Sequence, residues 1–381
     1  MLAVLNYDRY DRLPVVNFGF LRGTLDRWVL EGHITPQEAD SADPGDGTPG
    51  EQRLSEKLGF DCNYHTAFMP STRVEPPFER TVLEELPDGN RKVMTANGAV
   101  VLENDRCASI PMEVDHVLKG RKEWEEIFLP RLAYTEDRIN STLVHCPDRM
   151  LPFAEGGREY LASGRREHHY LLYCGNLYGV LRDYMGMENL CYLSADDPEL
   201  LDEMIDVNAE LCYQCFEGSL ATGVTFDIAH FWEDICFKNG PLVNPAFFAR
   251  KLGPHYRRIT DLLSKHGINL VSLDCDGVID SLLPVWFANG VNVMFPIEVG
   301  TWNASIKPWR EEYGRELRGV GGMDKRVFAR DYAAVEAEIE RLKPLVDLGG
   351  YIPCPDHRLA PDAKWDNVRY YTESMRRAFG G

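Results

Sequence analysis

The sequence predicts an α/β protein built as a (β/α)8 barrel with a small antiparallel β meander near its N-terminus. From about residue 120 onward, short apolar runs that do not alternate with polar residues are separated by amphipathic stretches. This pattern is typical of a parallel sheet whose outer side is covered by helices. About seven such strand–helix units fit a barrel better than an open sheet, which usually has about five or six strands. No Gly-x-Gly-x-x-Gly motif or Walker loop follows any of the strands, which argues against a nucleotide-binding sheet.

The expected elements follow one another as strand, loop and helix within a single domain, residues 1–381. Strands are expected at 13–18, 169–174, 223–229, 268–273, 291–295, 317–321 and 349–353. The clearest amphipathic helices are expected at 198–220, 245–265, 327–345 and 367–379. Residues 36–50 are rich in Pro, Gly and Asp and are expected to form a loop.

Residues 79–105 differ in pattern from the rest of the chain. Two short alternating runs, 81–86 and 91–96, are separated by Asp88-Gly89-Asn90, and Asn97-Gly98 then leads into 99–102. Because these turn sequences favour the positive φ of tight hairpins, they predict a small antiparallel meander.

The charge and cysteine content limit the partners and the compartment that we expect. Sixty acidic against 41 basic residues give a formal net charge of −19, which repels the phosphate backbone of nucleic acids. No apolar run approaches the ~20 residues needed to span a bilayer, and the N-terminus lacks the features of a signal peptide. Ten irregularly spaced cysteines in a chain of 381 residues are typical of reduced thiols. We therefore expect a cytoplasmic protein that binds neither nucleic acid nor membranes.

Polar side chains follow six of the predicted strands at the point where each strand ends. In a (β/α)8 barrel these positions surround one mouth, where active sites are found. Acids, amides and histidines gathered at one mouth predict a catalytic or ligand-binding site rather than a contribution to stability. The residues are Asn176, His230, Glu233, Asp234, Asp274, Asp276, Glu298, Asp324, Lys325, Asp356 and His357.

The Asp274-Cys275-Asp276-Gly277 segment allows two interpretations. Asp276 could cap the helix that follows a simple turn. Alternatively, Asp274 and Asp276, two residues apart, could face the same way and share a ligand or metal.

Other residues of the set also have simpler interpretations. Glu233 and Asp234 could form the acidic first turn of a helix, where the helix dipole favours carboxylates. Asp324 and Lys325 could form an ion pair, and His357 could be a packed or solvated loop histidine.

Several segments, in order along the chain, resemble the uroporphyrinogen decarboxylase superfamily, which also contains cobalamin-dependent methyltransferases. They are GNLYGVLRDYMGME at 175–188, WEDICFKNGP at 232–241, DCDG at 274–277, FPIE at 295–298, GGMDK at 321–325 and DHRLAPDAKWDNV at 356–368. The resemblance extends from Leu13 to the C-terminus and implies a distorted (β/α)8 barrel. Members of the superfamily often pair into homodimers, so a homodimer is one possible assembly. The meander at 79–105 would then belong to an N-terminal extension.

The chain departs from the decarboxylases at the residues that the resemblance assigns to the tetrapyrrole. Their arginine-rich segment would fall at 17–23, which contains one arginine, and Asn17 there becomes a candidate substrate-binding residue. Their catalytic aspartate would fall at Phe68. A substrate with eight carboxylates needs convergent cations, so this activity is less favoured. The loose candidates for such cations are Arg22, Arg182 and Arg310.

The methyltransferases of the superfamily hold zinc with a His-x-Cys motif after one strand and a Cys after the last. The corresponding places read Asp274-Cys275-Asp276 and His357. The resemblance therefore implies Zn²⁺ or another divalent metal held by Asp274, Asp276 and His357. Such an oxygen-rich set suits polarising a methoxy or hydroxyl group. The same residues could instead bind the polar group of a substrate without a metal.

The leading functional hypothesis is a corrinoid-linked methyltransferase acting on a small methylated substrate, with the corrinoid supplied by a partner protein. Glu233 or Asp234, together with Glu298, would act as acid or base. The candidate substrate-binding residues are Asn17, Asn176, His230, Asp324 and Lys325. Two alternatives stay open: a metal-independent decarboxylase of a tetrapyrrole or other carboxylic acid, and a barrel that binds a ligand or a corrinoid protein without catalysis.

Overall fold

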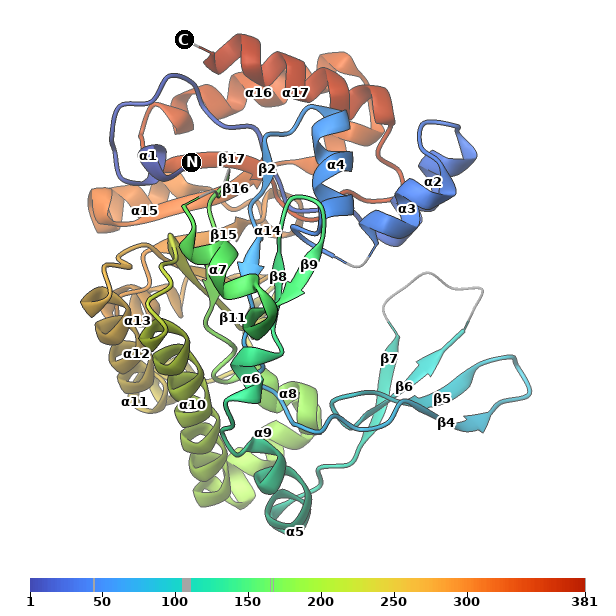
Figure 1. The fold of residues 1–381 in the computed structure, drawn as a ribbon, viewed down its shortest axis with the longest axis vertical. Coiled ribbons are helices and arrows are strands. Elements are labelled where there is room, and N and C mark those ends of the chain that lie inside the picture. Colours follow the sequence, from blue (N-terminus) through green and yellow to red (C-terminus); the bar gives the residue numbers. More distant parts are fainter. Residues whose placement is uncertain (44, 105–110, 165, 167, 381) are drawn as a thin grey trace.

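The chain folds into a parallel β-sheet covered by helices, with a smaller antiparallel sheet projecting from it (Figure 1). The computed structural model describes residues 1–43, 45–104, 111–164, 166 and 168–380. The expected α/β class is confirmed.

The central sheet has seven parallel strands in the order β17-β16-β15-β14-β11-β10-β3. Their bounds are β3 Ala67–Phe68, β10 Leu171–Tyr173, β11 Ile228–Trp232, β14 Val271–Asp274, β15 Val293–Ile297, β16 Arg318–Met323 and β17 Tyr351–Pro355. Every residue of β14, β15 and β17 is buried. Strands covered on both faces read as continuous apolar runs, which is why the sequence pattern located most of this sheet.

Two further short strands lie between the edges of the central sheet. β1 (Val16–Asn17) pairs in parallel with β2 (Cys62–Asn63), and β2 leads into β3. Phe20, just after β1, forms a parallel bridge with Leu359, just after β17. The strands of the described residues therefore do not form one continuous closed ladder, and the arrangement is similar to a (β/α)8 barrel without complete closure.

Helices cover the outside of the sheet. Around the lower left of Figure 1 lie α10 (Pro198–Ala221), α11 (Pro245–Lys251), α12 (Gly253–Lys265) and α13 (Leu283–Ala288), and at the top lie α16 (Tyr332–Val346) and α17 (Trp365–Phe379). The remaining helices are α1 Leu2–Leu5, α2 Arg22–Leu30, α3 Pro36–Ala42, α4 Pro49–Leu58, α5 Arg121–Glu123, α6 Asp137–Asn140, α7 Gly157–Ala162, α8 Gly179–Met185, α9 Met187–Asp196, α14 Val299–Trp302 and α15 Ile306–Tyr313.

The predicted turn-rich region at 79–105 lies in a four-stranded antiparallel sheet, β4-β5-β6-β7, which extends away from the helices and the central sheet (Figure 1). Its strands are β4 Thr81–Glu85, β5 Arg91–Met94, β6 Ala99–Glu103 and β7 Met112–His116. The first three match the expected runs, and β7 was not expected because four of its five residues are exposed and it lacks an apolar face.

Some predicted boundaries were wrong. The strand expected at 223–229 begins at Ile228 and continues to Trp232, so His230 lies within β11 and not after it. The helix expected at 245–265 is divided into α11 and α12, since Pro254 in the first turn of α12 has no N–H to continue α11. The loop expected at 36–50 contains α3 and the start of α4, because Thr35 and Thr48 cap these helices.

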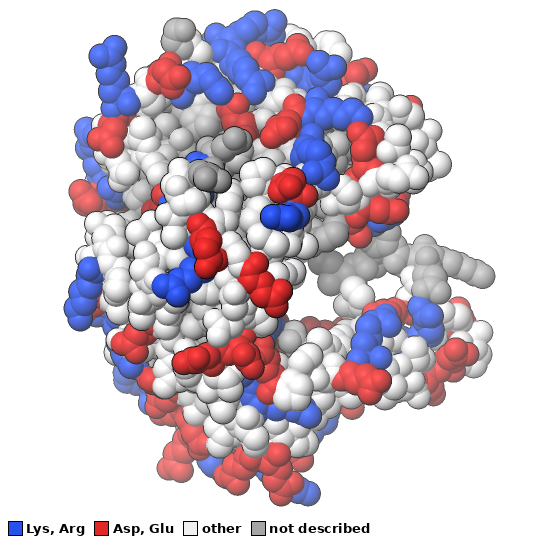
Figure 2. Space-filling model, viewed as in Figure 1, with Lys and Arg blue, Asp and Glu red and all other residues white. Residues whose placement is uncertain are grey.

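Charged side chains of both signs cover the surface shown in Figure 2. Figure 2 shows Asp and Glu side chains interspersed with Lys and Arg, without a continuous basic area on the face that it colours. Within the described ranges, none of the helices combines the length and apolar character needed to cross a membrane.

Candidate functional site

A cavity of about 560 Å³ opens where the parallel strands end. Residues at the ends of β10, β11 and β14, or in the segments after β1, β2, β3, β11, β14 and β17, line it, as expected for the carboxyl-terminal mouth of such a sheet. The lining residues are Phe18, His65, Met69, Pro70, Ser71, Thr72, Arg73, Tyr173, Trp232, Asp234, Asp274, Asp276, His357 and Arg358.

Three carboxylates converge on this cavity. Carboxylate oxygens of Asp234, Asp274 and Asp276 lie within 4.8 Å of one another. Asp234 adopts a left-handed backbone conformation (φ 49°), and its Oδ1 accepts the backbone N–H of Asp276 at 3.2 Å. Burial, followed by repulsion from neighbouring carboxylates, raises the pKa of Asp274 well above its usual range and that of Asp234 to about 6. A strained non-glycine residue at such a place is typical of a functional site.

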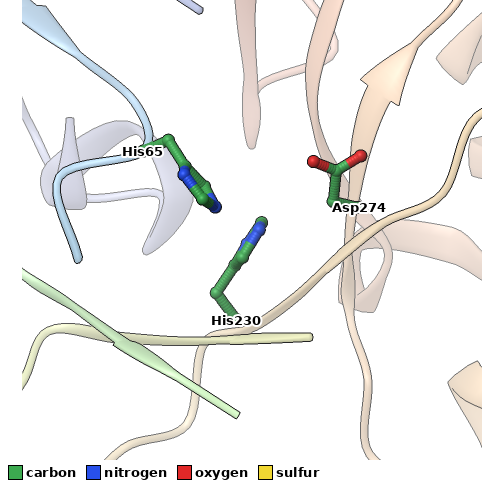
Figure 3. Close-up of side chains that lie close together, drawn as sticks. All are labelled: His65, His230 and Asp274. Atoms are coloured by element: carbon green, nitrogen blue, oxygen red, sulfur yellow. The ribbon is translucent and has the colours of Figure 1, made fainter. Parts of the chain in front are cut away.

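Two imidazoles lie on the other side of Asp274. The rings of His65 and His230 point toward one another, with their centroids 4.6 Å apart, and the carboxylate of Asp274 lies beyond them (Figure 3). His230 is fully buried in β11, and its Nδ1 lies 3.0 Å from Ser272 Oγ, which is hydrogen-bonded in turn to the Tyr64 hydroxyl at 2.7 Å. Burial, followed by the neighbouring His65, lowers the pKa of His230 well below its ordinary value.

The Asp46 carboxylate supports His65 from behind. Asp46 Oδ2 lies 3.6 Å from His65 Nδ1, and Asp46 also contacts the Arg358 guanidinium and the Asn63 amide. Burial alone would raise the pKa of Asp46, but His65 and Arg358 more than offset this and hold it low. Gly19 (φ +80°) makes room for the pair, since a Cβ there would lie 2.4 Å from Asp46 Oδ1.

A second hollow of about 380 Å³ adjoins the cavity and shares Asp276 and His357 with it. His357 Nε2 lies 3.6 Å from Asp276 Oδ2. Glu298 lines this hollow and accepts the Gly277 N–H at 2.5 Å, and burial, followed by repulsion from Asp276, raises its pKa. Lys325 also lines it, donates to the Arg358 carbonyl at 3.0 Å, and has a pKa lowered by burial.

Five of the predicted residues are absent from the lining of both hollows: His230, which lies within β11, and four residues that hold the backbone instead. Glu233 accepts the backbone N–H groups of 177–179 at 2.9–3.0 Å and is also bonded by the Tyr256 hydroxyl. Asn176 accepts the Val180 N–H at 2.5 Å, at the start of α8. Asn17 bonds Ser55 and Gly19, and Asp324 caps the short turn that follows it.

The predicted metal ligands are brought together only in part. Among the described residues, two groups place ligand atoms within 4.8 Å of one another: Asp234 with Asp274 and Asp276, and His65 with His230 and Asp274. His357 belongs to neither. Cys275 directs its Sγ toward the carbonyl of Asp276, and Cys354 is fully buried; neither lines the cavity. A thiolate-ligated zinc site therefore does not fit these residues.

The cavity lining also contains two arginine side chains that the sequence did not indicate as site residues. Arg73 and Arg358 line the cavity, whereas the suggested Arg22, Arg182 and Arg310 are absent from its lining. Arg358 directly follows the predicted His357, so the strand-end rule could have found it. His65 lies between two-residue strands that leave no apolar run, and the sequence carried no comparable signal for it.

Comparison with solved structures shows the fold. A methyltransferase from Methanosarcina mazei is similar over 99% of this chain and 97% of its own, with 15% identity and a TM-score of 0.59. A B12-independent methionine synthase from Shewanella sp. W3-18-1 matches over 96% of this chain and 98% of its own, with 11% identity and a TM-score of 0.47. No protein-family model matches the sequence, and no curated protein matches it either. The chain thus has a fold similar to that of the methyltransferase from Methanosarcina mazei.

Proposed function

We propose that this chain is an enzyme that removes the methyl group of a small substrate bound in the cavity and passes it to a corrinoid carried by a partner protein. One observation carries this proposal: Asp234, Asp274 and Asp276 converge on a cavity at the mouth of the sheet. The likeness to a methyltransferase fold is consistent with it.

The charges around the cavity favour a neutral or cationic substrate. Both guanidinium groups of the lining are already paired, Arg358 with Asp46 and Arg73 with Asp183 at 2.8 Å. Among the described residues, neither Asp274 nor Asp276 forms an ion pair with a Lys or Arg side chain. Asp276 lies near His357 instead. A carboxylate-rich tetrapyrrole would therefore meet net negative charge, which disfavours the decarboxylase alternative.

In the proposed reaction, the bond between the methyl carbon and a heteroatom breaks and its electron pair stays on the heteroatom. Asp234 donates a proton to that heteroatom, so the demethylated product leaves neutral. A reduced corrinoid on the partner protein would supply the electron pair that takes up the methyl group. The Asp276 N–H and the left-handed backbone fix the position of Asp234. Asp276, His357, Glu298 and Lys325 in the adjoining hollow bind the polar end of the substrate and orient it.

The test is demethylation with free reduced cobalamin as acceptor. Methoxyarenes, methylamines and methyl thioethers are incubated with the protein, and the demethylated product is measured by mass spectrometry. Asp234→Asn should lower the rate by roughly 10²–10⁴-fold, the usual contribution of a positioned acid. Asp261→Asn, at an exposed position on α12, should leave the rate unchanged.

Absence of product from every methyl donor would contradict the proposal, as would a fully active Asp234→Asn variant. Saturable binding of a methyl donor without turnover would instead support the non-catalytic alternative.

A further inference from the structure

We infer that His65, His230 and Asp274 form a mononuclear site for a divalent transition metal beside the cavity. This set differs from Asp274, Asp276 and His357, the ligands that the sequence resemblance implies. It shares only Asp274 with them and draws its two nitrogen ligands from the β2–β3 connection and from β11.

The first argument is the convergence of ligand atoms. The three side chains offer one ligand atom each within 4.8 Å of one another. Figure 3 shows the two rings directed toward one another and toward Asp274. Bonds of about 2.0–2.2 Å to one metal ion place ligand atoms roughly 3–4 Å apart, so small side-chain rotations would complete the site.

The second argument is that both histidines carry an unsatisfied buried nitrogen. Nε2 of His65 and Nε2 of His230 have no hydrogen-bond partner among the described residues. His230 is fully buried, so no solvent compensates its Nε2. A buried polar atom without a partner costs free energy, and a bound ion is one partner that would remove this cost.

The third argument is the support behind each imidazole. A histidine that binds metal through one nitrogen usually donates the N–H of the other to a carboxylate or another acceptor. Here His65 Nδ1 faces Asp46, itself held by Arg358, and His230 Nδ1 faces Ser272. Both histidines therefore have a polar partner on the Nδ1 side, and their Nε2 atoms lack a hydrogen-bond partner among the described residues.

The donor set indicates the class of metal. Two imidazoles and one carboxylate, with positions left open, suit Zn²⁺ or Fe²⁺ rather than Ca²⁺ or Mg²⁺, which prefer oxygen ligands alone. Asp274 lines the cavity, so an open coordination position there would bind the heteroatom of the methyl donor; this role, unlike the site itself, rests on the proposed function.

The test is metal binding by the full-length protein, measured without reference to turnover. The chain is freed of metal with a chelator, then titrated with Zn²⁺ by calorimetry and with Co²⁺ by visible absorption, which reports nitrogen and oxygen ligands. One ion per chain should bind. His65→Gln and His230→Gln should each weaken binding on the order of 100-fold or more.

Matched variants separate this site from the neighbouring carboxylates. His357→Gln removes a cavity histidine outside the site and should leave the Zn²⁺ affinity unchanged. Circular dichroism establishes that each variant is folded; if His230→Gln is not, the half-buried His65 provides the decisive variant.

Failure to bind either ion would overturn the site, as would binding that survives His65→Gln but is lost in Asp276→Asn. These outcomes are distinguishable from failure of the proposed function. Metal binding without demethylation refutes methyl transfer alone, whereas demethylation without metal binding refutes the site alone.

Discussion

Glu51 provides a quantitative test of the electrostatics beneath the cavity. This carboxylate, in α4, is buried under the loop that carries Asp46; it accepts the Gly47 N–H at 3.1 Å and the Ser55 hydroxyl at 2.5 Å. Burial, opposed by these hydrogen bonds and reinforced by Asp46, raises its pKa from 4.5 to about 7. The folded protein therefore binds a proton at Glu51 that the unfolded chain has already released between pH 4.5 and 7.

The sign of the effect follows from this difference in protonation. Where the folded state holds more protons, the free energy of unfolding falls as the pH rises. The contribution of Glu51 is thus most favourable below pH 4.5 and is lost by about pH 8. One pKa unit corresponds to about 1.4 kcal/mol, so the shift of Glu51 amounts to about 3 kcal/mol as an upper bound.

Glu51→Gln replaces the carboxylate by a neutral group of the same shape, whose carbonyl can accept from Gly47 while its amide donates to Ser55. The variant should be more stable than the wild type by up to about 3 kcal/mol at pH 8, and the difference should vanish near pH 4.5. Urea unfolding followed by tryptophan fluorescence from pH 4.5 to 8 measures it. Glu56→Gln, at an exposed position on the same helix, should show no pH-dependent difference. A Glu51→Gln variant that is less stable at pH 8, or whose difference is constant with pH, would refute the reasoning.

Two further substitutions test the scaffold. Glu233→Ala should destabilise the protein by about 3 kcal/mol or more in thermal or urea unfolding, because it removes the acceptor for three buried N–H groups and the Tyr256 hydroxyl; unchanged stability would contradict the backbone-holding role. Gly19→Ala should cost about 1–3 kcal/mol, since φ is +80° and the new Cβ would meet Asp46, whereas Gly120→Ala, where a Cβ meets no atom within 4 Å, should cost little. Equal stability of the two alanine variants would show that the Asp46 loop moves aside freely.

The sequence located most strands of the central sheet, but not β3, because burial on both faces leaves long apolar runs. It also located Asp274, since an acid that directly ends such a run must lie at the mouth of the sheet. The same rule failed for β11. There the apolar run 223–229 begins five residues before the strand, and His230 lies inside the sheet instead of after it.

Finer placement within the site depends on single backbone angles and long-range contacts. Glu233 and Asp234 are adjacent and chemically alike, yet the left-handed turn at Asp234 directs one toward α8 and the other into the cavity. The sequence did not indicate His65 as a site residue, because it lies between strands of two residues each, which are too short to show a periodic pattern. Its partner Asp46 is distant in sequence and reaches it only through the fold.

Asp274 belongs to both groups of side chains around the cavity, so a charge bound near it affects both groups. Its carboxylate lies within 4.8 Å of ligand atoms of both the histidine pair and the aspartate pair. A divalent cation held by His65, His230 and Asp274 would therefore also offset the mutual repulsion of the three carboxylates, because Coulomb interactions over such distances are strong where water is partly excluded. Arg358 favours the charged form of Asp274 but does not prevent the rise of its pKa, and both Arg358 and Arg73 are already paired, with Asp46 and Asp183. The acidic cavity and the unsatisfied histidines then have a common explanation: a metal bound at their junction, and a substrate that carries no excess negative charge.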